Sequence, residues 1–375
     1  MKRLNTLSKA LIGLSTFVLA ASAFAQFPSK DKDREVQCPK EEIGPCAYAF
    51  PKDMGLACPR NFYVRGEFLL MQSKEDGLEF ALTNTNSATA GDVAPLTAGR
   101  IHGFSTESHK WDWDLGFRAG FGFYLNHDQW NVDASWTYLH IKNDKGTHLD
   151  GTGTVVPLWL GTVHVESSTD ASARWKGEYN VIDFRLGKPY HVSKYLVMQP
   201  YFGARGGWID QNYTARYSGT IDGQASSYAN MKASNDWWGI GARAGVDTEW
   251  LLGNGWQLLG CVSTSSLYSK FDIDQYDDVH THKYNIHHEF YTNIPNFELT
   301  LGLGYGQHFS KEKYYIGFKV AYEFIQWWDM NQMRKLFGTI DDGTDPANIA
   351  LAANDTTSRG DLKINGFSFR VYLDF

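Results

Sequence analysis

The last nine residues of the chain, FSFRVYLDF (367–375), alternate strictly between apolar and polar side chains. Their apolar face carries Phe367, Phe369, Val371, Leu373 and Phe375. A period of two predicts a β-strand with one apolar face, which must be covered by lipid or by another sheet. What covers this face therefore decides the fold.

Nine further segments have the length or the alternation of a strand. They are residues 62–70, 113–125, 130–141, 175–186, 195–208, 238–250, 256–268, 297–306 and 314–324. These strands are roughly 10 to 14 residues long, whereas strands of globular proteins usually have 5 or 6, and a tilted crossing of the hydrocarbon layer needs about 9 to 11. The sequence predicts ten clear strands, and the loops have room for up to about 16.

Short and long connections alternate along the chain. Short links lie near residues 126, 190, 253 and 311, and between them lie polar stretches at 72–112, 142–174, 210–237, 269–295 and 327–363. Short periplasmic turns with long external loops are typical of an outer-membrane barrel, and an even strand number lets the last strand close on the first. We therefore predict an all-β, transmembrane antiparallel barrel of the bacterial outer membrane. The alternative is a soluble β-sandwich, whose strands are usually shorter.

The first 25 residues have the pattern of a secretory signal peptide. Lys2, Arg3 and Lys9 precede an apolar run, and the segment ends in Ala23-Phe24-Ala25. Beyond it the sequence has no apolar stretch long enough for a membrane-spanning helix. We expect residues 26–59 to form a periplasmic N-terminal segment and residues 60–375 to form the barrel with long external loops.

The charge and the cysteine content of the chain limit the binding partners and disulfides that can be expected. Without the signal peptide the chain has 32 basic and 42 acidic residues, so nucleic acid is a poor partner. Three of the four cysteines, Cys38, Cys46 and Cys58, fall in the N-terminal segment and are the candidates for a disulfide. No cofactor is expected. The aromatic content of 15% fits strands and the membrane interface, where outer-membrane lipid and lipopolysaccharide are the expected surroundings.

Strand parity predicts which charged side chains face the lumen. In a membrane barrel the apolar face meets lipid and the polar face points inward. The inward set contains seven basic and nine acidic residues: Arg65, Glu67, Asp114, Arg118, Asp133, Asp183, Arg185, Arg205, Arg243, Asp247, Glu249, Glu298, Lys319, Glu323, Arg370 and Asp374. In a wide barrel these groups are hydrated and line a channel, whereas in a narrow one they must pair.

The sequence contains no strong catalytic or metal-binding motif. The sequence has no Walker loop, no His-Glu-x-x-His and no Gly-x-Ser-x-Gly, so we expect no catalytic residues and no enzyme activity. The weak metal candidates are His280, His282, His287 and His288, in a predicted external loop, and a solvated loop is the default interpretation. A second segment, WWDMNQMRKLF (327–337), is interpreted as a short amphipathic anchor at the outer rim, with a constriction inside the lumen as the alternative.

Several long strings resemble the Legionella-type major outer membrane protein family, which also has members in environmental chlamydiae. They are FYVRGEFLLMQSKEDGLEFAL (62–82), WDWDLGFRAGFGFYL (111–125), WNVDASWTYLHI (130–141), VIDFRLGKPYHVSKYLVMQPYFGARGGWIDQNY (181–213), FELTLGLGYG (297–306) and YEFIQWWDMNQM (322–333). The resemblance runs from about residue 60 to residue 375.

The resemblance implies an abundant pore-forming barrel at the cell surface, often in contact with host cells, and no catalytic residues. It also implies disulfide cross-links, for which Cys38, Cys46 and Cys58 are the available positions. Together with the strand pattern it leads us to expect a porin for small hydrophilic solutes and ions. The expected pore-lining residues are Arg118, Arg185, Arg205, Arg243, Asp247 and Glu249. The alternative is a surface adhesin or a structural envelope barrel with a plugged lumen. A homo-oligomer and recognition of the strand ending at Phe375 by the barrel-assembly machinery are further expectations.

Overall fold

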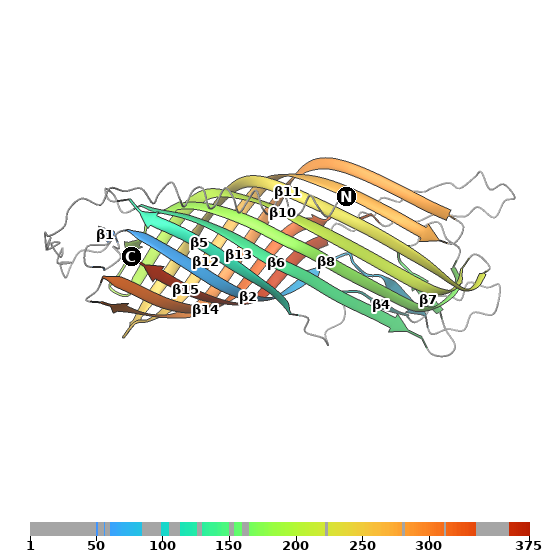
Figure 1. The fold of residues 1–375 in the computed structure, drawn as a ribbon, viewed down its shortest axis with the longest axis horizontal. Helices are drawn as coiled ribbons and strands as arrows, with labels where there is room; N and C mark the ends of the chain where they lie inside the picture. Colours follow the sequence, from blue (N-terminus) through green and yellow to red (C-terminus); the bar gives the residue numbers. More distant parts are fainter. Residues whose placement is uncertain are drawn as a thin grey trace. The chain divides into compact units, whose positions relative to one another are not determined.

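The computed structural model describes residues 50–51, 56, 61–84, 99–104, 113–125, 130–149, 154–159, 165–221, 224–279, 282–310, 313–334 and 360–375. All of these residues lie within the compact unit Ile43–Phe375. Their regular elements are β-strands (Figure 1). Among the described residues, no helix is long and apolar enough to span a bilayer.

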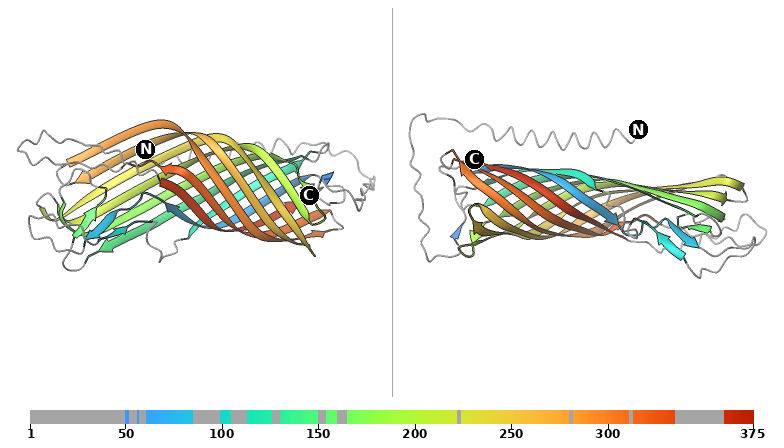
Figure 2. Two further views of the ribbon diagram at one scale, coloured as in Figure 1. Left: turned by 180° about the vertical axis from the view of Figure 1, so that it is seen from behind. Right: turned by 90° about the horizontal axis from the view of Figure 1, so that it is seen from below.

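Ten antiparallel strands form a closed barrel, as the sequence predicts (Figures 1 and 2). Each strand pairs with the next in the sequence, and the last one, β15, pairs with the first, β2. The barrel strands are β2 (Phe62–Glu75), β5 (Asp114–Tyr124), β6 (Asn131–His148), β8 (Val165–Gly187), β10 (Leu196–Ile221), β11 (Gln224–Gly253), β12 (Trp256–Val279), β13 (His282–Phe309), β14 (Tyr314–Asn331) and β15 (Gly360–Asp374). Because the sheet closes on itself within the membrane, its backbone groups are satisfied without water.

The short connections gather at the barrel end that carries Phe375. Between β11 and β12, Gly253, Asn254 and Gly255 all have positive φ, at 95°, 52° and 83°. Consecutive positive φ values are what a tight hairpin turn with Asn-Gly at its centre requires. At the same end, the short strands β1 (Phe50–Pro51) and β9 (Tyr190–His191) pair beside β10. Short turns identify this end as the periplasmic one.

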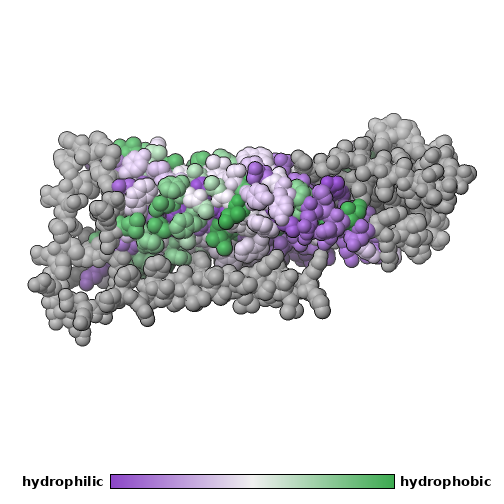
Figure 3. All heavy atoms as spheres, turned by 90° about the horizontal axis from the view of Figure 1, so that it is seen from above, coloured by the Kyte–Doolittle hydropathy of each residue, from purple (hydrophilic) through white to green (hydrophobic). Residues whose placement is uncertain are grey.

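The outward face of the barrel carries an apolar band bordered by aromatic residues. On β12 the outward side chains run from Trp256 to Tyr268, and on β13 they run from Tyr305 back to Tyr291. The Trp256 and Tyr305 rings lie 5.2 Å apart, and the Tyr268 and Tyr291 rings stack at 5.7 Å. Twelve steps of about 3.3 Å at a tilt of about 40° cover roughly 30 Å, the thickness of the hydrocarbon core. In Figure 3, hydrophobic residues gather toward the left of the described surface and hydrophilic ones toward the right.

Several strands continue far beyond this band on the external side. Residues 210–237 and 269–295, predicted as polar loops, instead extend β10 and β11, and β12 and β13, as paired hairpins. The prediction was wrong because the outward side chains are polar while buried ones, such as Tyr213, Ala215 and Tyr217, alternate with them. The strands therefore reach 23 to 30 residues in β8 and β10 to β13, not 10 to 14.

A small sheet packs against the inner face of this extension. It is built from β3 (Ala81–Asn84), β4 (Gly99–His102) and β7 (Thr154–Pro157). Beside it, Phe104 and Trp159 contact the ring of Tyr213, at 6.2 and 4.8 Å, and Tyr217 Oη donates a 2.6 Å hydrogen bond to the carbonyl of Phe80. All five aromatic side chains are buried in one hydrophobic cluster. The external part of the barrel is therefore filled by segments of its own connections.

Candidate functional site

Four charged side chains form a closed ring of ion pairs inside the barrel. Arg205 contacts Asp183 at 2.7 Å and Glu298 at 2.5 Å, and Arg243 contacts the same two carboxylates at 2.5 Å each. The side chains are 2 to 13% exposed and come from β8, β10, β11 and β13. We call these four residues the quartet. Two arginines and two acids compensate each other, as burial at low dielectric requires.

A second group surrounds Glu67 on the opposite side of the lumen. The fully buried carboxylate of Glu67 lies 2.8 Å from Arg118 Nη1, 2.8 Å from Arg370 Nε and 3.7 Å from Arg65 Nε. Arg118 also contacts Glu323 at 2.9 Å, and its Nε donates to Thr137. Strands β2, β5, β14 and β15 are joined across the interior in this way.

Asp133 extends the second group toward the quartet. Its Oδ1 accepts from Arg65 at 2.7 Å and from Arg185, which lies 2.8 Å away and also contacts Asp247 at 3.1 Å. Nearer the periplasmic end, Lys319 pairs with Glu249 at 2.9 Å. These pairs, the second group and the quartet together make up what we call the charged layer. It comprises Arg65, Arg118, Arg185, Arg205, Arg243, Lys319 and Arg370 with Glu67, Asp133, Asp183, Asp247, Glu249, Glu298 and Glu323. Seven cations face seven carboxylates, so the charged layer is formally neutral.

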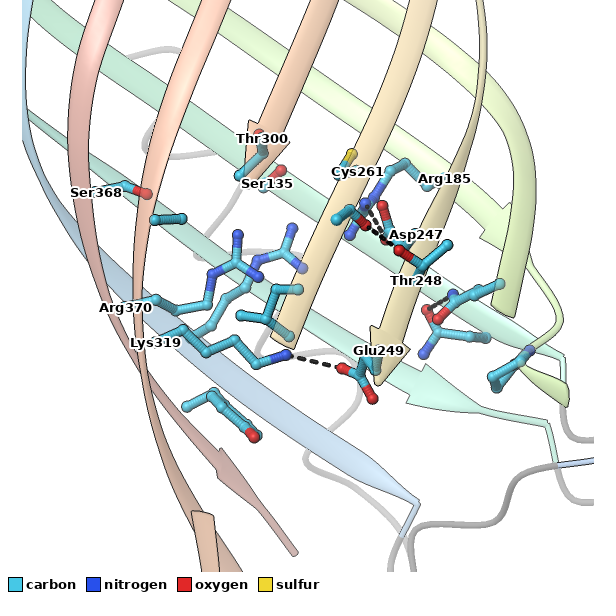
Figure 4. Close-up of a pocket in the computed structure, with 18 of the residues that line it drawn as sticks. Ser135, Arg185, Asp247, Thr248, Glu249, Cys261, Thr300, Lys319, Ser368 and Arg370 are labelled. Carbon is cyan, nitrogen blue, oxygen red and sulfur yellow. Dashed lines mark hydrogen bonds and ion pairs between the residues drawn. The ribbon is translucent and has the colours of Figure 1, made fainter. Parts of the chain in front are cut away.

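A polar cavity of about 470 Å³ lies among these residues. Its lining runs from Tyr124, Tyr315 and Asp374 at the periplasmic end to Arg205 and Glu298 of the quartet. Figure 4 shows Lys319 reaching toward Glu249 and Arg185 toward Asp247 across this space. The cavity can hold water or a small polar molecule, and it borders the charged layer.

An apolar layer follows on the external side of the quartet. Trp327 is completely buried, and its ring lies 5.3 Å from Trp237 and 6.2 Å from Tyr179, both in edge-on geometry. The guanidinium of Arg205 sits 5.7 Å from the Trp327 ring and joins the two layers through a cation–π contact. The remaining buried side chains of this layer are Leu69, Leu139, Ile209, Leu267, Ile294, Ile325 and Ile364. Nine of the ten barrel strands contribute to it, so the apolar layer is built from almost the whole circumference of the described barrel.

The described part of the segment 327–337, which ends at residue 334, belongs to the apolar layer and is not a rim anchor. Its first residues continue β14, and Trp327, Met330 and Met333 are buried in the hydrophobic cluster. Asn235 Nδ2 donates to the carbonyl of Met330 at 2.8 Å, which fixes the segment against β11. The interpretation as a rim anchor was wrong, because these side chains are buried inside the barrel, and a constriction of the lumen stays a prediction. The spacing of the methionines suggested a helix, but parity along β14 places Trp327 inward.

All six residues expected to line a pore line the cavity: Arg118, Arg185, Arg205, Arg243, Asp247 and Glu249. Their placement follows from strand parity. Sequence reasoning did not single out their partners Glu67, Asp133, Asp183 and Glu298, although parity had placed them in the lumen. Pairing between strands that are not neighbours leaves no signal in the alternation of one strand.

The histidine candidates are separated by the two faces of β13. His287 points outward, where Nδ1 lies 2.9 Å from Asp274 Oδ1, whereas the ring of the adjacent His288 lies 5.2 Å from that of Phe290. His280 and the side chain of His282 lie outside the described residues, as do Cys38, Cys46, Cys58 and the predicted signal peptide. The fourth cysteine, Cys261, is a free thiol in β12. Of the two histidines whose side chains the structure describes, His287 and His288, each lies on a different face of β13.

Comparison with known proteins gives three findings. A solved crystal structure of a Pseudomonas aeruginosa FadL homologue is similar at a TM-score of 0.29 and 11% identity, over 84% of this chain and 90% of that chain. No curated protein sequence matches. The model of the family described as Legionella pneumophila major outer membrane protein precursor matches residues 57–375. The chain therefore belongs to this major outer membrane protein family and is a β-barrel of the bacterial outer membrane.

Proposed function

We propose that the chain serves as a closed barrel of the outer membrane, a structural and surface-exposed element of the envelope, and not as an open diffusion pore. The observation that carries this proposal is that the charged layer and the apolar layer follow each other along the interior of a ten-stranded barrel. The charged layer is neutral and paired, and the apolar layer directly external to it is buried. This is the plugged-lumen alternative that the sequence suggests.

Passage of a hydrated ion is unfavourable at both levels. An ion that crosses the charged layer has to displace one member of a buried pair, and an uncompensated buried charge costs several kcal/mol. At the apolar layer the ion loses its hydration among the buried rings of Trp237 and Trp327. The two costs act in series, so we expect conductance to be negligible at low voltage.

The second candidate function is passive diffusion of small hydrophilic solutes and ions, the porin role expected from the resemblance. The polar cavity of about 470 Å³ favours it, because this cavity already forms the periplasmic part of a path. Completion of the path requires both the quartet and the ring of Trp327 to move. A diffusion role therefore predicts a gated pore.

Single-channel recording separates the two candidates. The full chain, folded and heat-modifiable in detergent, is inserted into planar bilayers beside a general-diffusion porin that serves as the assay control. We expect no stepwise current at low voltage from the parent chain under conditions in which the control opens. Stepwise ohmic currents at low voltage would overturn the closed-barrel proposal and support diffusion. In that case Glu298→Gln, which removes a lumen carboxylate, is expected to lower the preference for cations.

The proposal includes no catalytic role, since the charged side chains of the site are engaged in ion pairs. Recognition of the strand ending at Phe375 by the barrel-assembly machinery, formation of a homo-oligomer and contact with a host-cell surface stay predictions. The long external hairpins of β10 to β13 supply the surface on which such contact would occur.

A further inference from the structure

Three potential metal ligands, Asp272, His287 and Glu289, converge on the outward face of the β12–β13 hairpin, and Asp274 lies beside them. Asp272 lies directly opposite Glu289, and Asp274 lies directly opposite His287 in the antiparallel register. The imidazole occupies the centre of the group. Its Nδ1 is 2.9 Å from Asp274 Oδ1 and 3.4 Å from Asp272 Oδ1, and its Nε2 is 3.7 Å from Glu289 Oε1.

The spacing fits ligands that share one ion. One ligand atom from each of Asp272, His287 and Glu289 lies within 4.8 Å of the others. Around a transition metal with bonds of about 2.0 to 2.2 Å, neighbouring ligand atoms lie roughly 3 to 3.5 Å apart. Asp274 lies 2.9 Å from Nδ1, whereas Glu289 lies nearer Nε2, so Nε2 is the nitrogen available to join Asp272 and Glu289 on one ion.

The hydrogen bonding around Asp272 points to a missing partner. Its Oδ1 is shielded from solvent and accepts no hydrogen bond. Lys270 Nζ compensates only one oxygen of the group, Glu289 Oε2, at 2.9 Å. A divalent cation between Asp272 and Glu289 would supply the missing partner of Asp272.

The group is accessible to ions from solvent, and it lies where a bound ion would link β12 to β13 outside the apolar band. Glu289 is two residues beyond Tyr291, whose stack with Tyr268 marks the external border of the apolar band. The side chains are 37 to 54% exposed. Among the described residues, β14 pairs with β13 only from Asn296 onward, so the external part of β13 pairs with β12 alone.

We propose that Asp272, His287 and Glu289 form a surface site for a divalent transition-metal ion, with Zn²⁺ as the representative, and that Asp274 orients the imidazole through its Nδ1. Imidazole and carboxylates are common ligands of such ions, and bulk water is available to complete the coordination. The bound ion links β12 to β13 just outside the membrane. The site is independent of whether the lumen is closed.

The test uses the tag-free full chain in detergent after chelator treatment. Zn²⁺ is titrated by calorimetry, and Co²⁺ is titrated in parallel for its visible absorption, which reports nitrogen and oxygen coordination. His287→Ala is compared with His288→Ala, which changes the same residue type on the other face of the same strand. Asp272→Asn is the second test variant, because Asp272 Oδ1 accepts no hydrogen bond that the substitution would remove.

We expect one saturable Zn²⁺ site in the parent and in His288→Ala, and an affinity at least about tenfold lower in His287→Ala and in Asp272→Asn. The Co²⁺ spectrum should weaken in the same two variants while the heat-modifiable migration of all chains stays unchanged. Equal Zn²⁺ affinity in the parent and His287→Ala, or no saturable binding in the parent, would overturn the proposal.

Discussion

Arg205 on β10 donates a 2.5 Å hydrogen bond to Glu298 on β13, across the positions of two intervening strands. Neighbouring strands of a barrel are joined by their backbones, but this contact joins distant parts of the wall through the interior. It requires a narrow barrel, because two side chains must span the distance. The same contact therefore braces the wall and occupies the path a solute would take.

Removal of one cation from the quartet should destabilise the barrel strongly. Arg205→Met leaves Asp183 and Glu298 with Arg243 alone, and an uncompensated buried carboxylate costs about 3 to 5 kcal/mol. The expected result is a clear drop in the urea midpoint of unfolding in lipid vesicles.

The matched control is Arg174→Met. Arg174 pairs with Asp144 on the exposed part of β8 and β6, where the two side chains are 59% and 44% exposed. A surface pair of this kind contributes at most about 1 kcal/mol. Equal effects of the two substitutions would contradict the assignment of the quartet as a buried, interdependent set.

The apolar layer allows a similar comparison between adjacent residues. Trp327→Ala removes a fully buried ring that contacts Trp237 and Tyr179, and the cavity it leaves should cost about 3 to 5 kcal/mol of unfolding free energy. Trp328→Ala changes the next residue, which points outward and is 37% exposed. Thermal unfolding followed by the loss of heat-modifiable migration should show a much larger shift for Trp327→Ala. A larger shift for Trp328→Ala would contradict the assignment of Trp327 to the inward face of β14 and of Trp328 to the outward face.

The wall of the barrel was predictable from the sequence because lipid imposes a simple rule. Each strand must show a largely apolar face over the thickness of the membrane, and all ten predicted segments lie in the ten barrel strands to within one residue at the ends of the segments. The same parity placed residues such as Arg118 and Glu323 inside. What a single strand does not encode is the partner of each charge, since Arg118 meets Glu323 only after the barrel has closed.

The external half of the barrel was harder to predict, because the alternation of apolar outward and polar inward side chains ends at the aromatic border of the band. Beyond Trp208 the outward residues of β10 are polar, so the composition resembles a loop. The inward residues Tyr213, Ala215 and Tyr217 still alternate, but their partners Phe80, Phe104 and Trp159 come from connections without a periodic pattern. Long-range packing of irregular segments leaves no local signal.

A charge on the lipid face tests the position of the apolar band. Leu301→Arg places a cation on the outward face of β13, inside the band and four residues from its border at Tyr305, where burial in hydrocarbon costs up to about 4 kcal/mol. Asn285→Arg changes an exposed position on the same strand beyond Tyr291, so its effect should stay within about 0.5 kcal/mol. Urea unfolding in vesicles measures both. An unfolding free energy that Leu301→Arg leaves unchanged would contradict the contact of residue 301 with lipid.

The buried carboxyl of Asp277 should make stability depend on pH in the external extension. Asp277 lies nine residues beyond Tyr268 on β12, outside the apolar band, and is 4% exposed. Burial raises the pKa of its carboxyl to about 6, and the hydrogen bond from Gln275 offsets this only in part.

Since the folded-state pKa lies above the unfolded value of about 4, protonated Asp277 favours the folded state and this contribution is lost as the pH rises through 6. Asp277→Asn removes the cost of the buried charge. We therefore expect the variant to be more stable than the parent by up to about 3 kcal/mol at pH 8, with the difference disappearing near pH 4. Urea midpoints measured from pH 4 to 8 test this. A difference that does not change with pH would show that the substitution acts through packing and not through the charge of Asp277.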